Sequence, residues 1–335
     1  MSLHNQTKKR LTACLTLLAC GAALFPASVG AAGGVAPMSA KEMTYNANEQ
    51  DPVVSGRMSL GLANGQSGEY VYNPRSGRKV SDLQWGIDSV YMLGLGGSVS
   101  PLSWLKVNAD VWFKLNDGSG KMDDYDFMIP NYQYTDWSHH NVDLTTGLLF
   151  DINAEITFYR WAGSKFFGIA GFKHDDWEWE AKGGNYIYST YSLYDTVGNF
   201  PDDTKVITYE QKFNTPYIGI GFSSNLNPTP ITFSGRLIAS TLVSAEDKDQ
   251  HHLRDIVFEE KFDSGRMVGF DLGGAYNFTK NFSLMLAYHY QKYDEMKGET
   301  TQTDLTTGKI TKYTGEVAGI DNDLSIVSFS AIVSF

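Results

Sequence analysis

Apolar residues alternate with polar or small residues at the end of the chain. Between Leu324 and Phe335, positions 327, 329, 331, 333 and 335 are apolar, and serine stands at 328, 330 and 334. Ile326 and Ile332 interrupt the pattern. Successive side chains of a strand point to opposite faces, so this period of two is typical of a strand with one face toward lipid and the other toward a lumen.

Similar strand candidates recur along the chain from about residue 52. They start near Val53, Val80, Leu102, Val142, Lys165, Lys205, Pro230, Asp255, Phe282 and Leu324. Ten is an even number, as in single-chain bacterial barrels, and the aromatic last residue is similar to the insertion signal of such barrels. The sequence predicts an all-β fold, a single transmembrane antiparallel β-barrel of about ten strands with long extracellular loops.

The connections between these candidates alternate in length. The long polar ones run from Asn64 to Arg78, Asn116 to Asn141, Gly183 to Thr204, Ser244 to Arg254 and Tyr293 to Asn322, whereas turns such as Trp161–Ser164 and Leu226–Thr229 are short. In outer-membrane barrels the long loops face the outside and the short turns face the periplasm. We therefore expect residues capable of chemistry to gather at the extracellular mouth.

The amino terminus has the pattern of an export signal. Basic residues at positions 8, 9 and 10 precede an apolar run from Leu11 to Leu24, and residues 29–31 are suited to signal peptidase. An alternative is lipoprotein processing before Cys20, for which Leu18 is bulky. We expect a signal peptide at 1–31, a short amino-terminal segment at 32–50, and one barrel domain at 51–335.

Cysteine content and charge exclude several functions. Both cysteines, Cys14 and Cys20, lie inside the export signal, so the predicted mature protein has neither a disulfide nor a thiolate nucleophile. The formal net charge is −11, and removal of residues 1–31 takes away three bases and no acids, which makes it −14. Such a protein disfavours nucleic acid and attracts cationic peptides.

Two pairs of residues in the long connections have the spacing of a catalytic site. Asp124 with Asp126 and Asp249 with His251 are each two residues apart, so both members of a pair can point to the same side of a strand. If the pairs face one another, His251 could take a proton from a water molecule that the opposite acids hold. Taken alone, the spacing is weak support, because Asp in a polar loop is usually a solvated turn residue.

The chain resembles the omptins, a family of outer-membrane proteases, along nearly all of its predicted mature length. The stretches that carry the resemblance, in the family's order, are Ser59–Leu62, Gly77–Trp85, Met122–Asp126, Thr135–His140, Ala181–Ser189, Pro216–Gly219 and Asp247–His251. The resemblance implies a Gram-negative outer-membrane endopeptidase with its active site facing outside. It cuts after basic residues, preferably between two basic residues.

The resemblance also assigns roles to single residues. Asp124, Asp126, Asp249 and His251 fall on the family's catalytic pairs, Glu69 and Asp247 on the acids that hold Arg or Lys before the cut, and Asp136 on an acid for the following position. A cation between two partly desolvated carboxylates gains charge-assisted hydrogen bonds that a neutral side chain cannot replace. The expected partners are cationic peptides or proteins and outer-membrane lipid, and the expected state is a monomer.

One part of the family pattern is altered. Phe172, His174 and Asp176 stand where omptins usually have Tyr, Glu and Arg for lipopolysaccharide phosphate, and Lys212 replaces a second Arg. The region of residues 259–263 is also more acidic than a phosphate-binding outer face should be. We expect no cofactor, and dependence on lipopolysaccharide is in doubt.

Other interpretations of the same residues are possible. Adjacent histidines at 139–140 and 251–252 suggest a metal, but neighbours on a strand point apart, so each pair offers one ligand at most. We expect His140 to support the mouth by hydrogen bonding and His139, His174, His252 and His289 to lie at the surface or interface. The rival functions are a catalytically silent barrel acting as an adhesin, and a lipid-modifying barrel enzyme.

Overall fold

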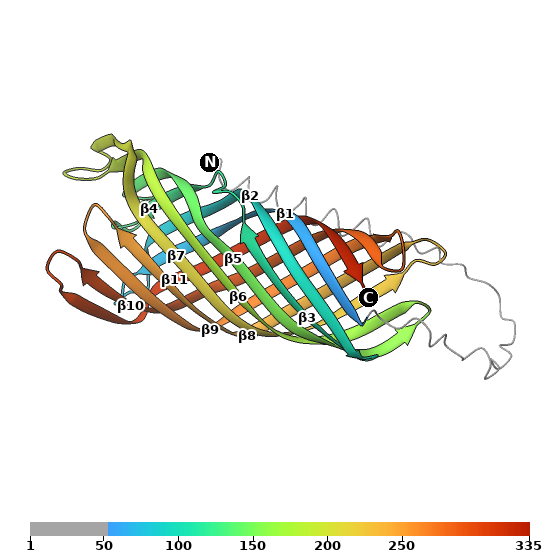
Figure 1. The fold of residues 1–335 in the computed structure, drawn as a ribbon. Helices are drawn as coiled ribbons and strands as arrows, with labels where there is room; N and C mark the ends of the chain where they lie inside the picture. The colour runs from blue at the N-terminus through green and yellow to red at the C-terminus, as the bar shows by residue number, and fades with distance from the viewer. Residues whose placement is uncertain (1–52) are drawn as a thin grey trace, which may run out of the picture. The chain divides into compact units, whose positions relative to one another are not determined.

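A computed structural model describes residues 53–335, all of them in strands or the connections between strands (Figure 1). The expected export signal and the segment up to residue 50 lie outside the described residues. Within residues 53–335, no helix is long and apolar enough to cross a membrane.

The strands follow one another as antiparallel neighbours. They are β1 (Val54–Tyr72), β2 (Lys79–Leu102), β3 (Leu105–Lys114), β4 (Lys121–Asp126), β5 (Asp136–Trp161), β6 (Ser164–Tyr188), β7 (Thr196–Asn225), β8 (Ile231–His251), β9 (Ile256–Asn277), β10 (Phe282–Asp304) and β11 (Ile310–Ser334). Strand β1 pairs with both β2 and β11, which closes the sheet into a ring without a free edge.

Strands β3 and β4 share one position in the ring. Both pair with β2 on one side and with β5 on the other, at different heights, and the break between them covers residues 115–120. Eleven strands therefore fill ten positions. The predicted all-β antiparallel barrel of about ten strands is confirmed.

The prediction of long polar loops is wrong in detail. Strand residues occupy much of all five of those segments. The connections that remain at this end of the barrel, which we call the loop end, are residues 73–78, 127–135, 189–195, 252–255 and 305–309. The physical reason is that beyond the apolar belt the outer face becomes polar while the period of two persists, so mean hydropathy falls although the strand does not end. The predicted catalytic residues thus stand on strands.

A belt of apolar side chains surrounds the half of the barrel that is remote from the loop end. On β11, Val327, Phe329 and Val333 are exposed, while Ser328 and Ser330 point inward and are almost fully buried. The belt includes Met58, Leu60, Leu95, Ile156, Phe158, Ile218, Ile220, Leu237, Leu242, Val268, Leu272 and Leu286. An exposed apolar surface that follows every strand is what a lipid bilayer requires. The strand portions beyond it rise clear of the lipid.

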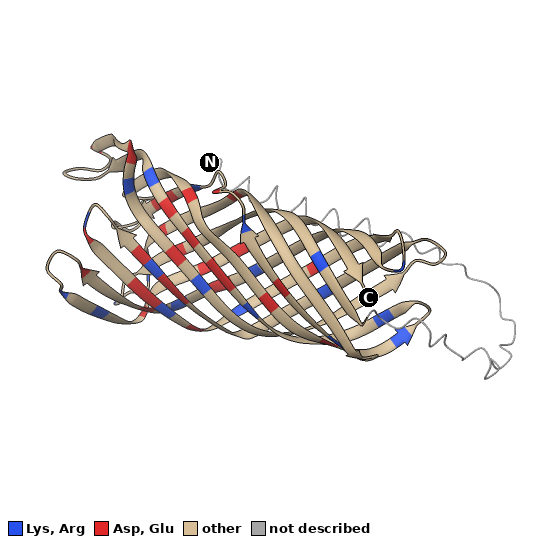
Figure 2. Ribbon diagram, viewed as in Figure 1, with Lys and Arg blue, Asp and Glu red and all other residues tan. Residues whose placement is uncertain are grey.

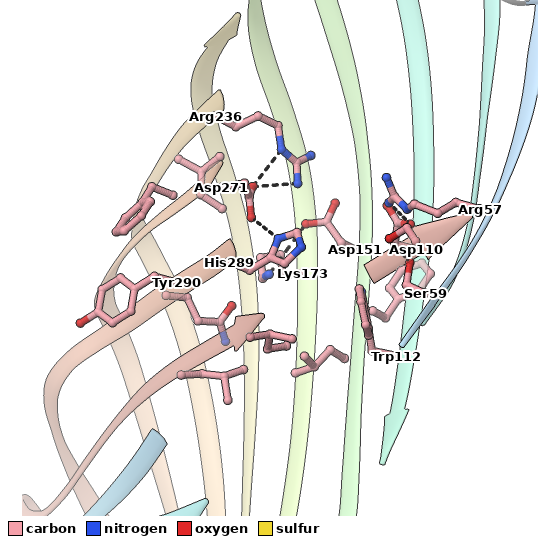
Figure 3. Close-up of a pocket in the computed structure, with 18 of the residues that line it drawn as sticks. Arg57, Ser59, Asp110, Trp112, Asp151, Lys173, Arg236, Asp271, His289 and Tyr290 are labelled. Atoms are coloured by element: carbon pink, nitrogen blue, oxygen red, sulfur yellow. Dashed lines mark hydrogen bonds and ion pairs between the residues drawn. The ribbon is translucent and has the colours of Figure 1, made fainter. Parts of the chain in front are cut away.

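Side chains fill the lumen behind the belt. Two apolar clusters, one around Trp85 and Trp177 and the other around Phe213 and Tyr293, occupy much of the interior. A cavity in the lumen, lined by both charged and apolar side chains, contacts members of both clusters (Figure 3).

Charged side chains pair along two walls of this cavity. Arg236 lies 2.8 Å from Asp271, whose other oxygen is 2.5 Å from His289. Arg57 pairs with Asp110 on the opposite wall (Figure 3). The expectation that His289 lies at the surface or interface is therefore wrong: an aspartate holds it in the lumen.

Loss of Arg236 should weaken the barrel. Arg236→Met removes the strongest partner of Asp271 and leaves a partly buried carboxylate with His289 alone, so we expect the free energy of unfolding to fall by about 2 kcal/mol. Urea unfolding in detergent, followed by tryptophan fluorescence, measures the change. Lys212→Met, which breaks the outer-face pair with Glu210, is the control and should cost below about 0.5 kcal/mol. Equal losses in the two variants would contradict the structural role of the lumen pair.

Candidate active site

Alternate side chains of β8 point into the lumen, and the predicted site residues of this strand are among them. Val243 and Ala245 point inward and are buried, and the same face continues with Asp247, Asp249 and His251 toward the loop end. Asp249 Oδ2 lies 2.6 Å from His251 Nε2. The structure therefore places the Asp–His pair in direct contact, with the aspartate almost fully buried and the histidine partly exposed to solvent.

The tautomer of His251 follows from its second neighbour. Arg254 Nη2 lies 2.8 Å from His251 Nδ1. A guanidinium can only donate, so Nδ1 accepts, and a neutral ring then carries its proton on Nε2, toward Asp249. In this arrangement Arg254 occupies the one lone pair with which a neutral His251 could accept a proton.

Asp124 and Asp126 stand on β4, on the inward face that begins with the buried Met122. Ser81 Oγ donates to Asp124 Oδ1 at 3.5 Å. Burial, and then the charges of Asp126 and Asp249, raise the pKa of Asp124 well above its usual range. Burial, and then the charge of Asp136, also raise the pKa of Asp126, while His251 acts in the opposite direction. These mutual effects show that the two pairs are close enough to interact across the lumen.

Glu69 and Asp247 form a second acidic group deeper in the lumen. Trp85 Nε1 donates to Glu69 Oε2 at 3.2 Å, and the Tyr209 hydroxyl donates to Asp247 Oδ2 at 3.0 Å. Both carboxylates are 5% exposed. Burial and the surrounding acids raise the pKa of each well above its usual range. This excess of negative charge suits a cation.

Asp136 begins β5 and lies opposite Asp126 in the β4–β5 register. Its Oδ1 accepts the backbone N–H of Ser189 at 2.8 Å, which ties it to the connection after β6. It is half-buried at the loop end, beside the Asp124–Asp126 pair. This position is compatible with a subsite next to the reacting bond.

The remaining histidines of this half are structural. His140 is fully buried, where its Nδ1 contacts the Gly183 carbonyl at 2.5 Å and its Nε2 contacts Ser138 Oγ at 2.8 Å. His139 points outward and contacts Asp123 at 2.8 Å.

The backbone of β6 bends beside these histidines at Gly184. Its φ is +98° and a Cβ atom would overlap the His139 carbonyl, so only glycine fits this bend.

Sequence analysis missed two residues of the site and misplaced a third. It assigned no role to Arg254, which contacts His251, or to Tyr209, which contacts Asp247. It counted Glu260 with the outer face, yet Glu260 is 6% exposed and faces the lumen, and only its neighbour Glu259 is exposed outside. The alternation of β9, with Phe262 and Glu260 on one face, was the signal that could have found it.

Acidic residues are concentrated in the half of the barrel toward the loop end (Figure 2). Near the candidate catalytic pairs, the charge of Arg254 lowers the pKa of both Asp124 and Asp126, against the larger effect of burial. No group of three His, Cys, Asp or Glu side chains in that described range could hold a metal ion. The chemistry available to these residues is proton transfer between water, histidine and carboxylates.

Comparison with known proteins shows the relatives of the chain. The chain is 34% identical to the plasminogen activator of Yersinia pestis over 268 residues, which cover 79% of this chain and 84% of that protein. It is 29% identical to the outer membrane protease OmpP of Escherichia coli, covering 80% and 86%. The crystal structure of the outer membrane protease OmpT from Escherichia coli superposes with a TM-score of 0.81 and 25% identity, covering 86% of this chain and 98% of that one.

These relatives support an enzyme over the adhesin and lipid-modifying alternatives, and they place the protein in the outer membrane. The sequence pattern of the omptin family matches residues 50–333, almost the whole described barrel. The chain belongs to the omptin family and is an outer-membrane protease.

Proposed function

We propose that the protein is an endopeptidase that cuts after a basic residue, preferably between two basic residues, with its active site facing outside. The observation that carries the proposal is the 2.6 Å contact between Asp249 and His251, opposite the Asp124–Asp126 pair. The relatives that are named as proteases support the reaction class.

The proposed reaction begins with a water molecule between the two pairs. Substrate binding displaces Arg254 from His251 Nδ1, because that nitrogen carries the one lone pair that can accept a proton. Asp124 and Asp126 hold the water, and His251 Nδ1 takes one of its protons as the oxygen attacks the scissile carbonyl carbon. Asp249 stabilises the imidazolium that forms, since its carboxylate already contacts Nε2. When the carbon–nitrogen bond breaks, His251 returns the proton to the leaving amine. No metal or other cofactor takes part in these steps.

The acidic groups would select the substrate. Glu69 and Asp247 receive the basic side chain before the cut, and Asp136 receives the basic side chain after it. The burial of Glu69 and Asp247 explains why a neutral side chain would bind poorly: it leaves these carboxylates desolvated without a cation. The ring closes within a single chain, so a monomer suffices for the whole site.

Lipopolysaccharide is not required in this proposal. Asp176 faces outward on β6, opposite Lys212 on β7 and near Glu210, so the outer face at this position is not the cationic surface that phosphate needs. Cleavage should proceed in detergent without lipopolysaccharide.

The first test is cleavage of a fluorogenic peptide with an internal Arg-Arg bond by the refolded barrel, with and without lipopolysaccharide. We expect cutting in both conditions. The Asp249→Ala/His251→Ala double variant should lose about 1,000-fold or more in kcat, because it lacks the base and its partner. The matched control is Asp123→Ala/His139→Ala, which removes an Asp–His contact of 2.8 Å on the outer face and should keep the rate. A folded wild-type barrel that cuts no such peptide would refute the proposal.

Arg254 should restrain the enzyme. Its guanidinium occupies His251 Nδ1 and repels cationic substrates, so we expect Arg254→Ala to raise kcat/KM by about fivefold. Arg254→Lys, which keeps the charge, should lie between the two. Steady-state kinetics on the same peptide give the answer, and a lower kcat/KM in Arg254→Ala would show instead that Arg254 assists catalysis.

The pH dependence of KM follows from the raised carboxylate pKa values. A carboxylate with a raised pKa stays neutral to a higher pH and attracts a cation only when it loses its proton, so KM should continue to fall as pH rises beyond the usual carboxylate range. A peptide with citrulline in place of the first arginine is the control, because its neutral side chain should give a KM independent of pH. If both peptides show the same profile, Glu69 and Asp247 do not select the cation.

A further inference from the structure

Glu260 is an acid of the lumen with no role in the proposed reaction. It lies on β9 directly opposite Asp247 of β8 and opposite Thr300 of β10. Its side chain is 6% exposed and faces inward with Asp247, whereas Glu259 points outward. A carboxylate is seldom buried without a cation or several donors, so its position requires an explanation.

Several carboxylate oxygens of this cluster lack a hydrogen-bond partner. In the described part of the chain, Asp247 Oδ1, Asp249 Oδ1 and Glu260 Oε2 are all buried and unpartnered. The second oxygen of Asp247 already accepts the Tyr209 hydroxyl. A protonated Glu260 can share a hydrogen bond with Asp247. Apart from that bond, no donor of the described residues satisfies these three oxygens, so the cluster can accept an external donor.

The groups around Glu260 are acidic or neutral. Asp247 and Asp249 face it from β8, Glu69 from β1, Tyr209 from β7 and Thr300 from β10. Burial above all raises the pKa of Glu260 to about 8, with a contribution from Asp249. Glu260 therefore carries a proton at neutral pH while the site is empty.

We propose that Glu260 is the third carboxylate of the site that receives the basic side chain, and that it binds the guanidinium of arginine together with Glu69 and Asp247. This inference rests on the proposed function, whose pocket it extends by one residue. A guanidinium carries five N–H donors in a planar fork, enough to reach several carboxylates at once, whereas an ammonium carries three donors on a single nitrogen. The third acid thus favours arginine over lysine.

The proposal includes a proton balance. When the guanidinium arrives, the Glu260 carboxylic acid loses its proton to solvent and the resulting carboxylate accepts hydrogen bonds from the cation. No other bond changes. Binding at neutral pH therefore releases protons, and fewer should be released when Glu260 is replaced by glutamine.

The kinetic test compares Glu260→Gln with wild type at pH 8, on peptides with arginine or lysine before the cut. We expect KM for the arginine peptide to rise about tenfold, kcat to change less than about twofold, and the preference for arginine over lysine to shrink. Glu260→Asp should recover part of the affinity. Glu259→Gln removes the same charge from the outer face and should behave as wild type.

The binding test does not depend on turnover. Arginine amide is titrated calorimetrically into wild type, Glu260→Gln and Glu259→Gln at pH 7 in two buffers of different ionisation enthalpy, which gives affinity and proton release. Weaker binding and smaller proton release in Glu260→Gln alone support the proposal. Equal affinity and proton release in all three, or no binding to folded wild type, overturn it.

The two proposals can fail separately. If wild type cuts the arginine peptide and Glu260→Gln matches it in KM and proton release, the role of Glu260 is wrong and the proposed function stands. If wild type cuts nothing, the proposed function is wrong, and the calorimetric comparison still decides whether Glu260 binds the cation. Heat-dependent mobility in gels verifies that each variant is a folded barrel.

Discussion

Closure of the sheet is the constraint on which the rest of the structure depends. Because β1 pairs with both β2 and β11, every strand has two neighbours and its register is fixed on both sides. A shift of one residue would exchange the lumen and outer faces of a strand. On β11 this register buries Ser328 in the lumen and exposes Phe329 to lipid. On β8 it points Asp249 into the lumen, beyond the apolar belt. The register of the closed sheet therefore determines both the lipid-facing surface and the positions of the acids in the lumen.

The site concentrates charge that the fold alone would not favour. Glu69 and Asp247 are buried near one another, Asp124 is half-buried and faces the charge of Asp249, and burial raises the pKa of all three. Each such group is less stable when ionised than it would be in water, so the loop end is held at a cost in stability. The membrane half has the opposite arrangement, with Arg236 and Asp271 neutralising each other. Within residues 53–335, Glu69 and Asp247 have neutral hydrogen-bond donors and no ion pair, at the end of the lumen where a cationic substrate is expected.

The sequence alone predicted the barrel and the strand number, because the period of two and the even spacing of strands are local properties. It also selected Asp124, Asp126, Asp249 and His251 as candidates, which the structure brings together. The contact of Arg254 with His251 depends on how the short connection after β8 folds. The contact of Tyr209 with Asp247 depends on the register of β7 against β8. Neither is encoded in the spacing of the residues alone. Strand ends were misjudged because hydropathy falls where lipid ends, whereas hydrogen bonding continues. Glu260 was misplaced because its face depends on register rather than composition.

The continuation of β8 beyond the belt also sets the height of the Asp249–His251 pair above the membrane. Leu242 is the last exposed apolar residue of β8, and Asp249 follows seven residues later. At about 3.3 Å per residue along a strand tilted by about 45°, the Asp–His pair stands roughly 16 Å above the end of the apolar belt. A peptide lying flat among lipid tails is out of reach. Chains that project from a partner's surface, or move freely in solution, meet the acids first.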